Sequence, residues 1–393
     1  MFSERTNWKL TRNRFTEALE EVRAAGTKIL DLTVSNPTRV GLPHDEQAIL
    51  ASLASPRALD YDPQPKGLLS AREAVAGYYR DEHAIREFDP ERLVLTTSTS
   101  EGYSHVLRLL CNPGDELLVP KPSYPLFEFL ADLQDVKLVP YPLIYDHGWQ
   151  MDFPSLEKAV TPRTRGMVVV HPNNPTGSYV SRHEQEALNQ FCCEHRLALI
   201  LDEVFLDYAH DHGENSAPRS SFAANRDALT FTLSGLSKIA ALPQMKVAWI
   251  AVSGPQTEVE AALARLEVIA DTYLSMNAPI QWATPVLLEQ RRSMQKQVLD
   301  RVRGNLAEID RQLAAQKTCE RLNVEGGWYA VLRVPVTQSD EDLAIALLRQ
   351  KSVVVHPGHF YDLPTDGYLV LSLITQKDEF AEGIQRMLEM LNP

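Results

Sequence analysis

The chain has 393 residues, of which 44% are hydrophobic and 23% are charged, and its formal net charge at pH 7 is −13. This length and composition predict a globular protein with a large core, organised as two domains or as one large and one small domain. The acidic balance argues against a nucleic-acid-binding surface, and the four cysteines lack metal-ligand spacing. Because the N-terminus has no apolar signal region and no run of about 18 apolar residues occurs, we expect a cytoplasmic protein without a membrane segment.

The first part of the chain, residues 1–30, has apolar residues at helical spacing and predicts an arm followed by a helix. The stretch ILDLTVSNPTRVGLP then predicts a short strand that ends in a polar loop, broken by proline, at 35–39. A turn-rich segment follows and leads into a predicted helix over 68–79.

Short apolar runs then recur along the chain, with helical or turn segments between them. There are seven such runs, at 92–97, 116–120, 136–141, 166–170, 197–201, 228–233 and 247–252. Because each run is continuously apolar rather than alternating, it is typical of a strand that is covered on both faces, as in a largely parallel sheet. We therefore predict an α/β fold whose large domain holds a mostly parallel, seven-stranded sheet sandwiched by helices.

The last third of the chain changes character. Residues 256–320 are predicted to be helical throughout, and strands then alternate with helices up to the C-terminus. We expect this final part to form a smaller α+β domain. The predicted boundaries are an N-terminal arm and part of the small domain over 1–45, a large domain over 46–289 and the small C-terminal domain over 290–393.

Polar residues gather at the ends of the predicted strands, where ligands bind in open α/β sheets. The run at 92–97 is followed by three hydroxyl residues that open a helix, Ser98, Thr99 and Ser100. Hydroxyls and N–H groups at a helix N-terminus suit a phosphate group. The same pattern is also typical of a plain helix N-cap, with Glu101 as its capping-box acid.

Four more predicted strands are followed by residues that can bind or react with a ligand. Tyr124 offers an aromatic face or is an ordinary core or rim ring, and Asn174 lies in the constrained turn HPNNPTG. Asp202 is a carboxylate that needs a cationic or hydrogen-bonding partner when buried. Lys238 lies in the turn SGLSK, where desolvation favours the neutral amine that Schiff-base chemistry requires. Together these residues describe a pocket for pyridoxal 5′-phosphate (PLP), whose pyridine nitrogen a carboxylate keeps protonated.

With HPNNPTG, LDE and SGLSK in this order, the sequence resembles the class I/II aminotransferases of the fold-type I PLP enzymes over nearly its whole length. The stretches SNPTRVGLP, YDPQPKGLLSAREAVAGYY, LDEVFLDY and GGWYAVLRVP match as well. The resemblance implies that Lys238 forms the Schiff base and moves the proton, and that Asp202 pairs with the pyridine nitrogen. It also implies that Asn174 donates to the phenolic oxygen and that Tyr124 stacks on the ring.

The remaining implied cofactor contacts involve the phosphate group and the rim of the pocket. The resemblance assigns the phosphate to Ser98, Thr99 and Ser100, and places Ser237 and Phe205 in the cofactor site. Members of this group are usually homodimers with sites at the interface, and by that analogy Tyr61 reaches the neighbouring subunit's phosphate.

Two departures from the family pattern concern the cofactor. Phe205 stands where a tyrosine usually donates to the phenolic oxygen, so we expect the Schiff base to keep its proton to higher pH; Tyr208 is an alternative donor. Lys246 stands where an arginine usually binds the phosphate, which keeps the charge and loses the bidentate fork.

The third departure concerns the substrate. The stretch YLVLS puts Val370 where the family has the arginine that binds the substrate carboxylate, a pairing that supplies both energy and orientation. We consider Arg39, beside Asn36 in the predicted substrate loop, as a replacement, and His359 as a second candidate. Either residue is equally compatible with a plain surface charge.

These observations predict a PLP-dependent aminotransferase that moves an amino group from an amino donor to a keto acid by a ping-pong mechanism. The alternative is a PLP-dependent lyase or amine-acting enzyme of the same fold, which the valine at position 370 favours. A third hypothesis is a PLP-binding protein without turnover, against which Lys238, Asp202 and Asn174 argue.

Overall fold

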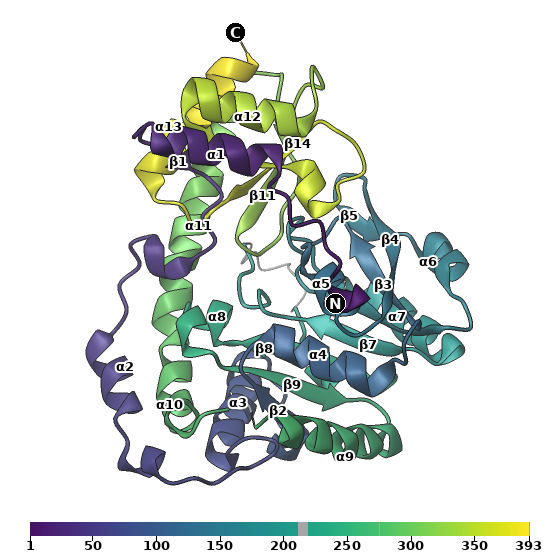
Figure 1. Ribbon diagram of the computed structural model, residues 1–393. Coiled ribbons are helices and arrows are strands. Elements are labelled where there is room, and N and C mark those ends of the chain that lie inside the picture. Colours follow the sequence, from purple (N-terminus) through teal and green to yellow (C-terminus); the bar gives the residue numbers. More distant parts are fainter. Residues whose placement is uncertain (211–218, 275, 393) are drawn as a thin grey trace.

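All seven predicted apolar runs form strands in the computed structural model, which describes residues 1–210, 219–274 and 276–392 (Figure 1). The strands lie in one sheet, in the order β2-β9-β8-β7-β6-β3-β4-β5. Six of them run in one direction, and β9 and β5 run against them. Their bounds are β2 (Leu93–Thr96), β3 (Glu116–Lys121), β4 (Lys137–Tyr145), β5 (Trp149–Met151), β6 (Thr164–Val170), β7 (Ala198–Asp202), β8 (Thr230–Gly235) and β9 (Ala248–Ser253).

The sheet has eight strands where the sequence predicted seven. The additional strand, β5, pairs antiparallel with β4 at the edge of the sheet through a tight turn at Asp146–Gly148. It consists of the three residues Trp-Gln-Met, which are too short and too mixed in polarity to stand out as an apolar run.

The sheet is buried on both faces because alternate residues of its strands pack against different helices. In β6, Val168 and Val170 face one layer, whereas Met167 and Val169 face the other. The first layer consists of α4 (Thr99–Leu110), α5 (Leu126–Asp132) and α9 (Gln256–Tyr273). The second consists of α3 (Leu69–Glu82), α6 (Phe153–Ala159), α7 (Arg182–His195) and α10 (Ala278–Glu289).

The predicted helix over 256–320 is interrupted. Leu274 ends α9 in a left-handed conformation, and Asn277 begins α10 by accepting a hydrogen bond from the Ile280 N–H at 3.1 Å. A third helix, α11 (Arg291–Leu313), spans both lobes of the molecule, and the strand β10 (Glu320–Arg321) follows (Figure 1).

A second lobe combines the N-terminal segment with the last part of the chain. Its four-stranded sheet has the order β10-β11-β14-β13, and β1 pairs with β12 beside it. One apolar cluster joins residues from Phe15 to Val40 with residues from Val298 to Leu388. The further elements are α1 (Arg14–Ala24), β1 (Leu30–Asp31), β11 (Tyr329–Arg333), α12 (Asp340–Lys351), β12 (Val353–Val354), β13 (His356–Pro357), β14 (Tyr368–Ser372) and α13 (Lys377–Leu391). The exact domain boundaries stay a prediction.

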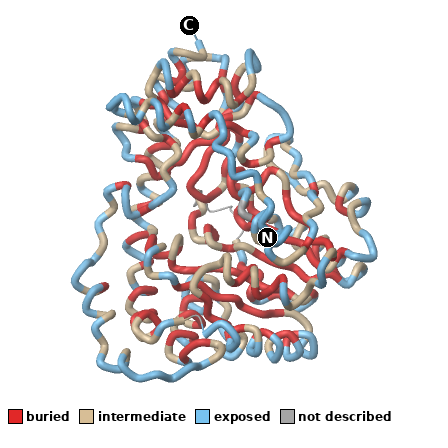
Figure 2. Tube along the Cα trace, in the orientation of Figure 1, coloured by how far each residue is buried: buried red, intermediate tan, exposed pale blue. Residues whose placement is uncertain are grey.

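Buried residues lie mainly in the large sheet and in the interior of the second lobe, as Figure 2 shows. The helix α2 (Glu46–Leu53) and the segments on either side of it are mostly exposed. Within the described ranges, no helix is both long and apolar enough to span a membrane.

Candidate active site

Asp202 is the last residue of β7, at the carboxyl edge of the sheet. The Val204 N–H donates to Oδ1 at 3.2 Å, and the Tyr103 hydroxyl donates to Oδ2 at 3.1 Å. Burial raises the pKa of Asp202 to about 6, although these two hydrogen bonds and the charge of Lys238 lower it. Among the described residues no cation lies within 4.0 Å of the carboxylate. Asp202 is half-buried, and a carboxylate without a cationic partner at such a position is suited to a positively charged group of a bound molecule.

Lys238 lies in the four-residue helix α8 (Leu236–Ile239), which begins where β8 ends. Its amine lies 5.7 Å from the centroid of the Phe205 ring and 5.4 Å from that of the Trp328 ring. Burial lowers the pKa of Lys238, and the charge of Asp202 opposes this. A lowered pKa increases the fraction of neutral amine, which is the nucleophilic form.

The HPNNPTG turn connects β6 with α7 and packs against the second lobe. Thr176 Oγ1 donates to Asn173 Oδ1 at 2.9 Å and holds the turn. Gly177 has a φ of 69°, and a Cβ there would lie 2.5 Å from the Gly326 carbonyl oxygen, so the contact requires glycine. Asn174 is buried, and its Oδ1 has no hydrogen-bond partner in the described part of the chain. Its Nδ2 also forms no hydrogen bond with a described residue, so the N–H donor of this amide is available to a bound group.

Ser98, Thr99 and Ser100 lie at the N-terminus of α4, with Ser98 as the N-cap. Ser98 Oγ accepts a hydrogen bond from the Glu101 N–H at 3.1 Å, which confirms the N-cap. Glu101 reaches back to the Thr97 N–H at 2.6 Å, one residue earlier than in a standard capping box. Thr99 and Ser100 are half-buried, and their hydroxyls form no hydrogen bond with described residues. They remain candidates for a phosphate.

Two residues of the site were not predicted. Tyr103 lies one turn into α4 and holds the Asp202 carboxylate, and Trp328 of the GGWY stretch is buried beside Lys238. For Tyr103 the only signal was its position one turn after the hydroxyl residues that begin the helix. Trp328 comes from the other lobe, so no local pattern connects it with Lys238.

Phe205 is buried next to Lys238, with its ring centroid 5.2 Å from that of Trp328. The hydroxyl of Tyr208 donates instead to the main-chain carbonyl of Lys238 at 2.6 Å. The hydroxyl of Tyr208 is thus occupied by a main-chain carbonyl. In this structure it does not replace the missing tyrosine at position 205 as a donor to the cofactor.

Three other predicted cofactor contacts differ in exposure. Tyr124 is 45% exposed, just before α5, and lies near Tyr329 and Tyr361. Ser237 is half-buried next to the lysine in sequence, and Lys246 is exposed, with a φ of 54°. No described residue forms an ion pair with Lys246. Their contacts with a cofactor stay predictions.

Val370 is buried in β14, opposite Val331 on one side and His356 on the other. Residues paired across a sheet share one face, so His356 is the polar neighbour of this position. Its Nδ1 lies 3.1 Å from the Tyr361 hydroxyl, and burial lowers the pKa of His356, although Asp31 raises it. The sequence argument did not consider His356.

The three predicted substrate-binding residues lie at the surface of the second lobe and the loop beside it. Asn36 Oδ1 accepts from the Thr38 N–H at 3.0 Å and caps a short 3₁₀ turn that ends at Arg39. Arg39 is exposed and forms no ion pair with a described residue. His359 is also exposed. Their roles in substrate binding stay predictions.

Tyr61 is 81% exposed and lies in the segment between α2 and α3. It lines a cavity that also contains Arg57 and Trp282, where the guanidinium lies 5.0 Å from the centroid of the indole ring. Its exposure leaves the ring free to contact another molecule.

The parallel strand ends bring a lysine, a half-buried carboxylate, an amide and a helix N-terminus together, which is the arrangement of a class I/II aminotransferase. The family model of class I and II aminotransferases matches residues 27–384, and the chain belongs to this family. Its relatives include the alanine aminotransferase of Mycobacterium tuberculosis, 30% identical over 376 residues that cover 93% of this chain and 86% of that protein.

Two further comparisons also match aminotransferases. The glutamate-pyruvate aminotransferase AlaA of Escherichia coli strain K12 is 31% identical over 264 residues, which cover 67% of this chain and 64% of that protein. The structure of an alanine aminotransferase from Pyrococcus furiosus has a TM-score of 0.89 at 20% identity, covers 100% of this chain and 99% of its own, and shares the fold. The predicted family, fold class and enzyme class, an aminotransferase, are confirmed. Members of this family use PLP.

Proposed function

We propose that this protein binds PLP and transfers an amino group from an amino donor to a keto acid by a ping-pong mechanism, with Lys238 as the Schiff-base residue. The observation that carries the proposal is the proximity of Lys238 and Asp202 at the carboxyl edge of the sheet, where the charge of each shifts the pKa of the other. Within the described part, neither group has an ionic partner within 4.0 Å, and both pKa values are shifted toward the neutral forms. Two half-buried ionisable groups without such partners are expected in a site that a bound ligand completes.

The residues present suit the cofactor. The Asp202 carboxylate would accept the pyridine N–H, the Asn174 amide would bond the phenolic oxygen, and Thr99 and Ser100 would hold the phosphate at the start of α4. When bound, PLP supplies the electron sink that stabilises negative charge at the donor's Cα. In the proposed reaction the Lys238 amine takes the proton from Cα of the donor and delivers it to C4′ of the cofactor. Its lowered pKa leaves it available as a base.

The choice of substrate is the less constrained part of the proposal. An alanine or glutamate donor with a keto-acid acceptor is the first pair to test, since relatives carry these names. Arg39 would bind the donor carboxylate in place of the absent arginine, beside Asn36, with His359 as the second candidate. The apolar Val370 favours the alternative, a lyase or amine-acting enzyme, because the usual partner for an α-carboxylate is missing.

Dimerisation is a further part of the proposal. The exposed Tyr61 would complete the phosphate site of a second copy of the chain, which makes a homodimer the functional unit. A cytoplasmic location also stays a prediction from the sequence.

A half-reaction assay on the PLP-loaded protein tests the proposal. Alanine, glutamate, other α-amino acids, ω-amines and a β-chloro amino acid are added singly, and the visible absorbance, keto acid and ammonia are followed. One equivalent of keto product without ammonia supports transamination, with Lys238→Ala as the control that abolishes it. Release of ammonia and pyruvate with recovery of the original absorbance would instead establish the lyase alternative.

A further inference from the structure

Tyr208 is tied to the main chain of Lys238. Its hydroxyl donates to the Lys238 carbonyl oxygen at 2.6 Å, and the side chain is fully buried. Burial raises the pKa of Tyr208 well above its ordinary value, so the hydroxyl keeps its proton. The Trp328 ring packs edge-on against the Tyr208 ring, with centroids 5.2 Å apart, and the same indole lies 5.4 Å from the Lys238 amine. These three residues form one packed unit.

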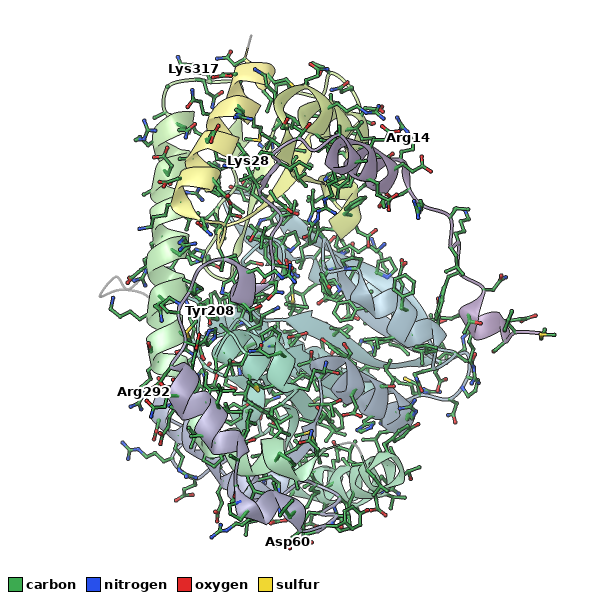
Figure 3. The ribbon with its side chains drawn as sticks, turned by 60° about the vertical axis from the view of Figure 1, so that its left-hand side comes forward. Arg14, Lys28, Asp60, Tyr208, Arg292 and Lys317 are labelled. Carbon is green, nitrogen blue, oxygen red and sulfur yellow. The ribbon has the colours of Figure 1, made fainter. Side chains whose placement is uncertain are left out.

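The preceding residue, Asp207, makes a second link to the same helix. Gln295 Nε2 of α11 donates to Asp207 Oδ2 at 2.6 Å and to the Ile239 carbonyl at 3.1 Å. Figure 3 shows Tyr208 beside α11, where this helix passes between the lobes. The other oxygen of Asp207 is held by the Tyr78 hydroxyl at 3.0 Å. The Lys238 carbonyl is therefore held directly by Tyr208, and the next carbonyl, of Ile239, is held by Gln295, whose amide Asp207 fixes.

These hydrogen bonds fix the orientation of the α8 backbone, which four residues stabilise only weakly by their own hydrogen bonds. Within this four-residue helix the Leu236 carbonyl accepts from the Ala240 N–H at 3.2 Å, and the Lys238 carbonyl accepts from the Ala241 N–H at 3.2 Å. The Ile239 carbonyl and the second bond to the Lys238 carbonyl depend on the side chains of Gln295 and Tyr208. The direction of the lysine side chain follows from the orientation of this backbone. Because Tyr208 is inaccessible to water, a lost hydroxyl could not be replaced by solvent.

We propose that Tyr208, assisted by Gln295, is a positioning residue that fixes the direction of the Lys238 side chain through the main-chain carbonyls of α8. This inference rests on the proposed function, in which Lys238 is the reactive lysine. Tyr208 lies six residues after Asp202, so its hydrogen bond also ties the segment that follows β7 to α8.

The test compares Tyr208→Phe with Tyr141→Phe. Tyr141 is a matched control, because it is equally buried and its hydroxyl donates to the Val168 carbonyl at 2.8 Å in the middle of the sheet. Hydrogen–deuterium exchange on the cofactor-free proteins is expected to rise over 236–242 in Tyr208→Phe alone. The rate of the first half-reaction is expected to fall about tenfold or more, with KM nearly unchanged, since displacing a reacting group is costly. Similar losses of thermal stability are expected in both variants.

A double-mutant cycle separates positioning from general damage. In the Lys238→Ala background, with added methylamine as external base, Tyr208→Phe is expected to have no further effect on the rate. An effect that persists there, or equal exchange in both tyrosine variants, would overturn the proposal. Gln295→Met serves as a second variant if Tyr208→Phe does not fold, and it is expected to give the same pattern more weakly.

The failure of the proposed function is recognisable separately. Borohydride reduction of the PLP-loaded protein and mass spectrometry of its peptides identify the modified lysine. If a lysine other than Lys238 is modified, the proposed function fails, whereas the exchange measurement still reports whether Tyr208 orders the helix.

Discussion

The hydroxyl of Tyr103 on α4 donates a 3.1 Å hydrogen bond to Asp202 Oδ2 at the end of β7, across 99 positions of the chain. The contact joins the helix that begins with the predicted phosphate-binding hydroxyls to the strand that carries the predicted partner of the pyridine nitrogen. Burial raises the pKa of Asp202, and this hydrogen bond is one of the interactions that lower it. Tyr103 thereby favours the charged form of the carboxylate.

Tyr103→Phe is expected to weaken PLP binding about five- to tenfold at pH 7, because the pKa of Asp202 rises further and a larger fraction becomes neutral. An absorbance titration with PLP at pH 7 and pH 8.5 measures the effect. The difference from the wild type should narrow at the higher pH, where Asp202 ionises in both proteins. An equal loss of affinity in Tyr141→Phe would contradict this explanation.

Asp202 also makes the stability of the cofactor-free protein depend on pH. Its folded pKa, about 6, lies above the ordinary value of 3.8, so its contribution is fully present below about pH 4 and is lost as the pH rises through 6. A shift of two pKa units corresponds to about 3 kcal/mol. Denaturant unfolding at several pH values should show a flatter profile for Asp202→Asn between pH 4 and 7. Identical slopes would show that the carboxylate is not desolvated as described.

Glu203 changes the pH dependence of the folding stability in the same direction as Asp202. Burial raises its pKa to about 7, although hydrogen bonds from Ser221 and the Phe222 N–H lower it. The Asp202→Asn profile should therefore keep a residual fall in stability as the pH rises through about 7.

Phe205→Tyr restores the donor that the family usually has at this position. We expect the pKa of the Lys238–cofactor linkage to fall by about one unit, since a donor to the phenolic oxygen stabilises its anionic form. Titration of the visible absorbance between pH 5 and 10 measures the shift. Phe205→Leu, which removes the ring without adding a donor, is the control and should not lower this pKa.

Arg39→Ala tests whether this residue binds the substrate carboxylate. The KM for an α-amino acid is expected to rise about ten- to a hundredfold, as for the loss of a hydrogen bond to a charged group. Steady-state kinetics with an ω-amine should be unaffected, and Arg182→Ala on α7, another exposed arginine, is the matched control. If His359→Ala reproduces the effect and Arg39→Ala does not, the second candidate is the correct one.

Tyr61 allows a test of the proposed homodimer. Lys238→Ala and Tyr61→Ala proteins are purified separately, mixed under conditions that exchange subunits, and assayed together. If Tyr61 completes the partner's site, hybrid dimers regain one intact site each, and activity should rise to about a quarter of the wild-type value. No gain over the unmixed proteins, once mass measurement shows that hybrids form, would mean that Tyr61 serves its own chain or none.

Much of the fold and of the site follows from local sequence. Continuous apolar runs predicted seven strands of the large sheet, because burial on both faces demands apolar residues at every position. Polar residues that follow those runs placed Lys238 and Asp202 in one predicted site, since the carboxyl ends of parallel strands lie on one edge of a sheet. Strand β5 escaped notice because three residues of mixed polarity carry no periodic signal.

Only the tertiary structure decided which side chains surround Lys238 and Asp202. Tyr103 reaches Asp202, Trp328 covers Lys238 from the other lobe, and Tyr208 holds the Lys238 main chain rather than the pocket. His356 is the polar residue that stands across the sheet from Val370. Sequence identifies a residue that follows a strand, because that position is a local property of the chain. The partner of its side chain depends on packing between segments a hundred residues apart, and only the folded chain brings those segments together.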